Sequence, residues 1–194
     1  MVERKIIDLS LQIEEGMPFY PGDPEPHVRK FIDYKDKGYM VHELNIGTHT
    51  GTHVDVPAHF IPGGKTLEKI GIEQFIGEGQ AFNYNEVDPS TEIVIIYTGT
   101  NKQWKKGWKM DNIKVIDEEL AMKLVRSKVK LVGIDSPSIG SSEVHRILLS
   151  NNTVIVENLS DTTSLLVGKK FTFYAVPILV SGVDGAQARA FAVL

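Results

Sequence analysis

The chain contains no cysteine among its 194 residues. This absence excludes a disulfide framework, a thiol nucleophile and a thiolate metal site. Any metal ion that the protein binds must therefore be held by histidine, aspartate or glutamate side chains.

Long hydrophobic runs are missing as well. No segment approaches the roughly 18 consecutive apolar residues that a membrane-spanning helix requires. The opening sequence MVERKIIDLS also lacks the apolar stretch of a secretory signal. We therefore expect a cytoplasmic protein with no membrane partner.

The chain also lacks an excess of positive charge. The chain has 21 lysines and arginines against 25 acidic residues, a net charge of −4. This balance argues against nucleic acid as a partner. Residues 101–110 carry Trp104 and Trp108 among four lysines, a composition that can stack on bases. A loop or lid is the alternative that the acidic balance favours.

Length and composition predict one globular domain over residues 1–194. Hydrophobic residues make up 42% of the chain and charged residues 24%, as in ordinary globular proteins. The periodicity predicts helices over residues 117–129 and 141–150, and strands over 6–13, 40–46, 92–97, 130–135, 153–156, 171–176, 178–180 and 188–193. Within 40–46, His42 falls on the apolar side and is expected to pack. The β-α-β-α-β order in the middle predicts an α/β fold with a mixed sheet and flanking helices.

Residues 49–59 read HTGTHVDVPAH and place three of the six histidines and one carboxylate within a short stretch. All four side chains are at odd positions, so they share one face of an extended chain. A straight strand would separate His49 from His59 by roughly 33 Å. The chain must therefore bend, and Gly51 and Pro57 are the residues that permit bends.

His53 and Asp55 lie about 7 Å apart along an extended backbone and can reach one ion together. Imidazole nitrogen with carboxylate oxygen suits zinc, manganese or iron(II). A helix that carries His49 and His53 as ordinary polar residues is the alternative. Gly51 and Pro57 disfavour that helix, so the stretch predicts a metal site.

Residues 17–24 contain three prolines and a glycine and form a stiff, irregular loop. The loop carries Phe19 and Tyr20, two aromatic rings held on a rigid backbone. A substrate pocket needs such a wall, so we predict that both rings contact substrate. A plain surface connection is the alternative.

The stretch HTGTHVDVPAHF resembles the signature of the putative cyclase family of metal-dependent hydrolases, which includes bacterial-type kynurenine formamidases and isatin hydrolases. The second ligand cluster of that family is a histidine and a glutamate twelve residues apart, the glutamate being followed by Asn-Leu. His145 and Glu157 have this spacing, and Asn158 and Leu159 follow. Without the resemblance, the sequence alone would be interpreted differently. His145 would be a half-buried residue of a helix, and Glu157 would be a carboxylate at the end of a strand, exposed to water.

The resemblance implies the swivelling α/β architecture of the family and two divalent ions per chain, zinc or manganese. It places His49, His53 and Asp55 on one ion, and Asp55, His145 and Glu157 on the other. His59, the last residue of the motif, is the candidate general acid and base. The implied reaction is hydrolysis of a small amide, an arylformamide such as N-formylkynurenine or a related cyclic amide, through a metal-activated hydroxide. The resemblance also implies a homodimer or homotetramer.

Two departures from the family pattern leave the substrate open. Tyr20 stands where formamidases usually have tryptophan, and residues 184–189 read DGAQAR where the family tends to have Asp-Gly-Ser-Pro-x-Arg. A lactone hydrolase or cyclase of the same family is one alternative. Another is a non-haem iron(II) oxygenase that uses His53, Asp55 and His145, a class that usually lies on an all-β jelly roll. The third is a metal-binding protein without catalysis.

Overall fold

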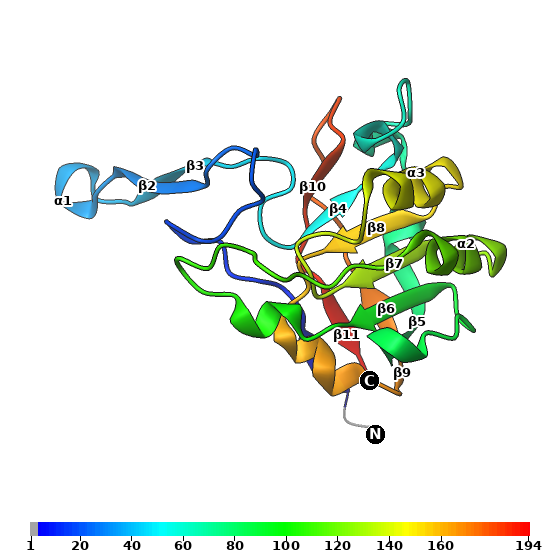
Figure 1. Ribbon diagram of the computed structural model, residues 1–194. Helices are drawn as coiled ribbons and strands as arrows, with labels where there is room; N and C mark the ends of the chain where they lie inside the picture. Colours follow the sequence, from blue (N-terminus) through cyan, green and yellow to red (C-terminus); the bar gives the residue numbers. More distant parts are fainter. Residues whose placement is uncertain (1–3) are drawn as a thin grey trace.

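A curled mixed sheet of nine strands forms the centre of the computed structural model, which describes residues 4–194 (Figure 1). The strand order is β1-β11-β9-β5-β6-β7-β8-β4-β10. Strands β5 to β8 pair in parallel, and the other neighbours pair antiparallel. The strands are β1 (Ile6–Asp8), β4 (His53–Asp55), β5 (Ile76–Asn83), β6 (Ile93–Tyr97), β7 (Leu131–Ile134), β8 (Val154–Glu157), β9 (Lys170–Tyr174), β10 (Gly185–Gln187) and β11 (Phe191–Val193). The predicted α/β class with a mixed sheet is confirmed, whereas the swivelling architecture stays a prediction.

Two helices, α2 (Glu118–Arg126) and α3 (Ser142–Ser150), pack side by side on one face of this sheet (Figure 1). Both begin at the predicted places, because the side chains of Asp117 and Ser141 accept hydrogen bonds from backbone N–H groups of the first turn. Short 3-10 helices are η1 (Pro57–His59), η2 (Leu67–Lys69), η3 (Ile72–Phe75), η4 (Tyr84–Glu86), η5 (Thr100–Gln103) and η6 (Asp161–Leu166).

The apolar run of β6 divides between two cores. Val94 and Ile96 pack in the cluster beneath α2 and α3, while Ile93 and Ile95 pack in the cluster on the opposite face. A strand covered on both faces needs apolar side chains at every position. This requirement explains why residues 92–97 show no alternation of apolar and polar residues.

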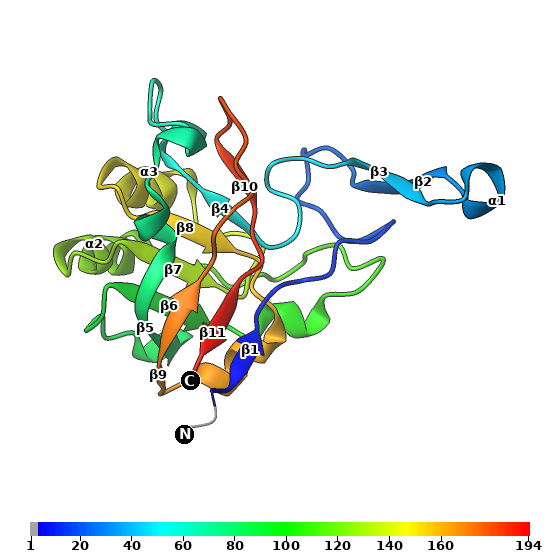
Figure 2. The ribbon, with the colours of Figure 1, turned by 180° about the vertical axis from the view of Figure 1, so that it is seen from behind.

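Strands β2 (His27–Ile32) and β3 (Val41–Asn45) form a separate two-stranded sheet, joined through the short helix α1 (Tyr34–Lys37). Figures 1 and 2 show this hairpin projecting from the body, and we call residues 27–45 the arm. Every residue of β3 is exposed. The expectation that His42 packs is therefore wrong, because neither face of the arm is covered.

Several predicted strand boundaries are also wrong. Only the first part of 6–13 is a strand, 188–193 is a strand only over β11, and residues 178–180 are irregular and exposed. Residues 178–180 follow Pro177, which cannot donate to a strand ladder. Strand β5 was not predicted, since its glycines weaken the strand signal. At Gly79 a Cβ atom would lie 2.9 Å from the Phe171 ring, so close packing requires glycine there.

Trp104 and Trp108 lie in a loop after η5, with their rings packed edge to face at a centroid distance of 6.1 Å. Between residues 4 and 194, no helix has the length and the apolar character needed to cross a membrane.

Candidate metal centre

The histidine motif bends at the two predicted residues. Gly51 adopts a left-handed backbone conformation with φ +64°, and Pro57 begins η1, with Val56 alone between it and the end of β4. As a result the rings of His49 and His59, ten positions apart in the sequence, lie with their centroids 4.0 Å apart. The motif therefore curls around one point instead of running straight.

Strand pairing brings the second half of the site to the first. Strand β4 lies antiparallel to β8, and in this register His53 is opposite Glu157. The Nε2 atom of His53 is 3.5 Å from Oε2 of Glu157. Val54 between the two polar positions packs in the apolar core, so His53 and Asp55 project from the opposite face.

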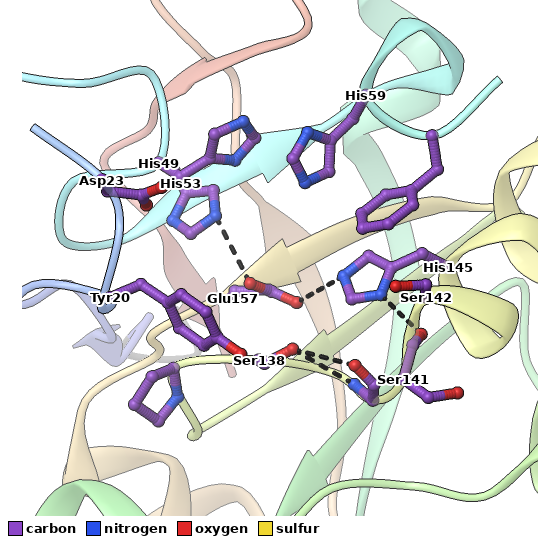
Figure 3. A pocket seen from close by; sticks show the side chains of 13 residues that line it. Tyr20, Asp23, His49, His53, His59, Ser138, Ser141, Ser142, His145 and Glu157 are labelled. Atoms are coloured by element: carbon purple, nitrogen blue, oxygen red, sulfur yellow. Dashed lines mark hydrogen bonds and ion pairs between the residues drawn. The ribbon is translucent and has the colours of Figure 1, made fainter. Parts of the chain in front are cut away.

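Helix α3 supplies the remaining histidine. His145 lies one turn into the helix, and its Nε2 atom is 3.2 Å from Oε1 of Glu157 (Figure 3). The ring of Phe60 stacks on the His145 ring at a centroid distance of 4.4 Å. The structure thus gathers all five residues that the sequence analysis assigned to metal, which are His49, His53, Asp55, His145 and Glu157.

Two backbone carbonyls fix the orientation of the buried imidazoles. Nδ1 of His53 donates to the Gly51 oxygen at 2.8 Å, and Nδ1 of His145 donates to the Ser141 oxygen at 2.9 Å. A neutral imidazole has one N–H group, so in the neutral, metal-binding form of each ring Nε2 is the acceptor. Backbone acceptors at the second nitrogen are typical of metal-ligating histidines, because they hold the ring and its tautomer in place.

The Nε2 atoms of both rings face carboxylate oxygens. Nε2 of His53 is 3.2 Å from Oδ1 of Asp55, in addition to its contact with Glu157. Although buried, Nε2 of His53 and Oδ2 of Asp55 have no hydrogen-bond partner. A neutral Nε2 of His53 and Oδ1 of Asp55, 3.2 Å apart, are both acceptors, so a cation, either a proton or a metal ion, must lie between them. The donor set of nitrogen and carboxylate oxygen fits a divalent transition metal.

Asp55 is the centre of the cluster and is fully buried. Its carboxylate lies 2.8 Å from Nδ1 of His49 and 3.8 Å from Nε2 of His145. Burial alone would raise the pKa of Asp55, but the positive charge and hydrogen bond of His49 and the positive charge of His53 hold it well below the usual range. Two sets of three residues each bring their possible ligand atoms within 4.8 Å of one another, and both sets contain Asp55. The first set adds His53 and Glu157, and the second adds His49 and His59.

Glu157 is the second buried carboxylate. Burial and the neighbouring Asp55 favour its neutral form, but the hydrogen bond from His145 and the positive charge of His53 outweigh them and lower the pKa of Glu157. Its Oε1 atom also accepts the backbone N–H of Ile139 at 2.6 Å. The site therefore holds two ionised carboxylates away from water, an arrangement that demands nearby positive charge.

Asp184 is a site residue that the sequence analysis did not assign. Its Oδ2 atom accepts hydrogen bonds from Nε2 of His49 at 2.9 Å and from Nδ1 of His59 at 3.0 Å, while Thr48 donates to Oδ1 at 3.1 Å. The two histidine contacts hold the pKa of Asp184 far below its usual range. The sequence feature that could have indicated Asp184 is its position as the first residue of the DGAQAR segment. With Nδ1 of His59 donating to Asp184, Nε2 of His59 is the acceptor.

The cluster lies at the wall of a cavity of about 510 Å³. Tyr20 lines the cavity, whereas Phe19 is absent from the lining and is 37% exposed. The predicted substrate contacts of both rings stay predictions. The lining also includes residues that the sequence analysis did not assign to the site, namely Asp23, Phe60, Pro137, Ser138, Gly140, Ser141 and Ser142 (Figure 3). The cavity thus joins the ligand cluster to aromatic and hydroxyl side chains.

Metal binding is expected to release protons. Burial alone would lower the pKa values of His49 and His53, but Asp55 and the other carboxylates raise them to about 11 and about 9. Both rings therefore hold a second proton at pH 7, and each must lose it to coordinate a metal. We expect the release of about two protons per chain on zinc binding at pH 7, and an affinity that rises with pH.

Titration calorimetry in buffers of different ionisation enthalpy measures this release. A binding enthalpy that does not depend on the buffer would contradict the assignment of His49 and His53 as ligands.

Comparisons with known proteins place the chain among hydrolases. Residues 7–89 match the family model described as putative cyclase. The chain is 35% identical over 182 residues to an uncharacterised protein of Methanocaldococcus jannaschii, covering 90% of this chain and 92% of that protein. It is 31% identical over 148 residues to a kynurenine formamidase of Geobacillus thermodenitrificans, covering 69% of each. The structure of isatin hydrolase A from Labrenzia aggregata superimposes with a TM-score of 0.82 at 16% identity, covering 98% of this chain and 94% of that one.

The fold, the buried cluster of histidines and carboxylates and these relatives define a metal-dependent hydrolase. The chain belongs to the putative cyclase family. The sheet is mixed and carries helices, unlike the all-β jelly roll expected for the oxygenase alternative.

Proposed function

We propose that the protein hydrolyses a small amide, either an arylformamide such as N-formylkynurenine or a related cyclic amide. The observation that carries the proposal is the meeting of two buried, ionised carboxylates with inward-facing imidazole nitrogens at the wall of a cavity. The similarity to a kynurenine formamidase supports the formamide, and the shared fold with an isatin hydrolase supports the cyclic amide.

The proposed ligand sets are those implied by the resemblance. His49, His53 and Asp55 hold one divalent ion, and Asp55, His145 and Glu157 hold a second, with zinc or manganese as the metal. The position of Asp55, in contact with all three histidines, supports its place in both sets. When bound, such ions would supply an activated water at neutral pH and polarise the substrate carbonyl.

His59 is proposed to move the proton. Hydrolysis of an amide requires that the attacking water lose a proton and that the leaving nitrogen gain one. The hydrogen bond from Nδ1 of His59 to Asp184 orients the ring and leaves Nε2 to exchange that proton. His59 lines the cavity, so this nitrogen is available to a bound substrate.

Aromatic walls suit an aromatic substrate. Tyr20 and Phe60 both line the cavity, and aromatic rings pack favourably on one another. We expect Tyr20→Ala to raise KM by about two- to tenfold, the equivalent of ~0.5–1.5 kcal/mol of ring contact. Tyr20→Phe, which keeps the ring, is the matched control and should retain a KM near that of the wild type.

Steady-state kinetics on the arylformamide substrate, with metal content measured on the same preparation, checks this expectation. If Tyr20→Ala changes neither KM nor substrate preference, the loop serves only as a connection.

A hydrolysis screen tests the proposed reaction. Formamides, cyclic amides and lactones are offered to the metal-loaded and to the chelated protein, and oxygen consumption is followed after anaerobic loading with iron(II). We expect amide hydrolysis that disappears on chelation and returns with zinc or manganese. Turnover of lactones alone would mean that the substrate is a lactone and not an amide. Oxygen consumption without hydrolysis would overturn the proposed hydrolase activity.

A further inference from the structure

The turn that carries His49 receives little support from its own backbone. It consists of residues 47–50, which we call the His49 turn, and the backbone N–H of Thr50 donates to the Gly47 oxygen at 3.2 Å, as in a β-turn. The chain enters this turn one residue after the arm, and none of the arm residues is buried. A surface connection with few buried contacts is mobile. A metal ligand on this turn therefore needs an anchor from the body.

The side chain of Gln187 supplies that anchor. Its Nε2 atom donates to three backbone oxygens of the turn, those of Gly47 at 2.7 Å, Thr48 at 3.1 Å and Thr50 at 3.3 Å. Three acceptors around one atom require the nitrogen end of the carboxamide there, because the oxygen end would face oxygen atoms only. A carboxamide nitrogen carries two N–H groups, so one of them is shared between two of the oxygens.

Strand β10 places Gln187 beside the turn. In the antiparallel register with β4, Gln187 is opposite His53 and Gly185 is opposite Asp55. Gly185 and Gln187 are two positions apart, so they share one face of the strand. A Cβ atom at Gly185 would lie 3.0 Å from Cε1 of the His49 ring, so glycine leaves room for that ring. The same face of β10 thus receives the His49 ring and holds its turn.

The His49 turn joins the metal centre to the loop of residues 17–24. Gly47 lies against Pro24, since a Cβ atom at Gly47 would lie 3.2 Å from Cδ of Pro24. Pro24 ends the stiff loop that brings Tyr20 to the cavity. In the same turn, Nδ1 of His49 lies 2.8 Å from Oδ1 of Asp55. A shift of this turn would therefore displace both a ligand and the support of a cavity wall.

We propose that Gln187 is a positioning residue that holds the His49 turn, and so keeps the His49 ring beside Asp55 to bind the metal ion. The proposal rests on the ligand role proposed above for His49. Gln187 does not line the cavity and acts through the backbone oxygens of the turn. Loss of a group that orients a ligand costs about 10- to 100-fold in metal affinity.

Competition for zinc between the loaded protein and a chromophoric chelator tests the proposal. The variant His49→Ala first shows which zinc affinity depends on His49. Gln187→Leu keeps the size of the side chain but removes the donor, so it should lower that same affinity about 10- to 100-fold. The affinity that depends on His145 and Glu157 should change less. General loosening of the fold would instead lower both affinities alike.

Gln74→Leu is the matched control. Nε2 of Gln74 also donates to backbone oxygens, those of Lys130 and Asn152, at 2.8 Å each. These two residues precede the amino ends of β7 and β8, whereas Glu157 is at the carboxyl end of β8. This control should keep the zinc affinities of the wild type. Circular dichroism establishes that each variant is folded. Gln187→Glu, which sets a carboxylate against the oxygens of the turn, repeats the test where Gln187→Leu is not folded.

The possible results separate this inference from the proposed metal centre. A loss in Gln187→Leu that is confined to the affinity dependent on His49 supports the proposal. Zinc binding equal to that of the wild type, an equal loss of both affinities, or the same loss in Gln74→Leu would overturn it. Unchanged zinc binding in His49→Ala would instead remove the ligand role of His49, and with it the role of Gln187.

Discussion

Asp55→Ala is expected to lose most of the bound metal and nearly all hydrolysis. The carboxylate of Asp55 contacts His49, His53 and His145 and is the group common to both proposed ligand sets. Loss of a residue that only supports a ligand costs about 10- to 100-fold in metal affinity. We expect a loss beyond this range for Asp55, because it would bind both ions directly.

Elemental analysis and turnover on one dialysed preparation measure the effect. Asp135→Asn is the matched control, since Asp135 is equally buried but accepts hydrogen bonds from the backbone of Thr98 and Gly99, away from the histidines. This control should keep its metal, whatever its thermal stability. Full metal occupancy in Asp55→Ala would remove the shared-ligand assignment.

His59→Ala is expected to keep its metal while kcat falls by about 10²- to 10⁴-fold, the usual contribution of a positioned acid and base. The prediction rests on the hydrogen bond from Nδ1 of His59 to Asp184, which leaves only Nε2 for chemistry. Added imidazole should restore part of the turnover, because it can carry the proton through the space left by the side chain.

The structure also defines the competing result. Ligand atoms of His59, His49 and Asp55 lie within 4.8 Å of one another, close enough to share an ion. If His59 is a ligand, metal content and activity fall together in His59→Ala, and imidazole restores both only with added metal. A variant with full metal and unchanged kcat would exclude His59 from the mechanism.

The local half of the site could be predicted because it lies in one stretch of sequence. The spacing of His49 to His59, with Gly51 and Pro57 between them, determined both the shared face and the bends. Helices α2 and α3 could be predicted for the same reason, since their caps and apolar periodicity are local. In contrast, His145 and Glu157 have ordinary structural explanations and needed the family resemblance.

Asp184 could not be predicted because its position depends on strand pairing. It contacts His49 and His59 across sequence separations of 135 and 125 residues. The contact arises because β10 pairs with β4, and the backbone N–H of Val56 donates to the Asp184 oxygen at 3.0 Å. No pattern within residues 184–189 indicates which strand lies beside them.

The arm illustrates a different limit. The alternation over residues 40–46 indicates a strand with one apolar face, and this much is correct for β3. The same alternation does not specify what covers that face. His42 was expected to pack because a covering core was assumed, whereas β3 pairs only with β2 and leaves the body.

Anomalous diffraction at the zinc edge, on crystals of the zinc-loaded protein, tests the central claim most directly. We predict a peak about 2.0–2.2 Å from Nε2 of His53 and from an oxygen of Asp55, two ligand residues that each have a buried atom without a hydrogen-bond partner. A second peak is expected beside His145 and Glu157. A map with no peak at the cluster, or with zinc only on exposed side chains, would contradict the assignment of this cluster as a metal centre.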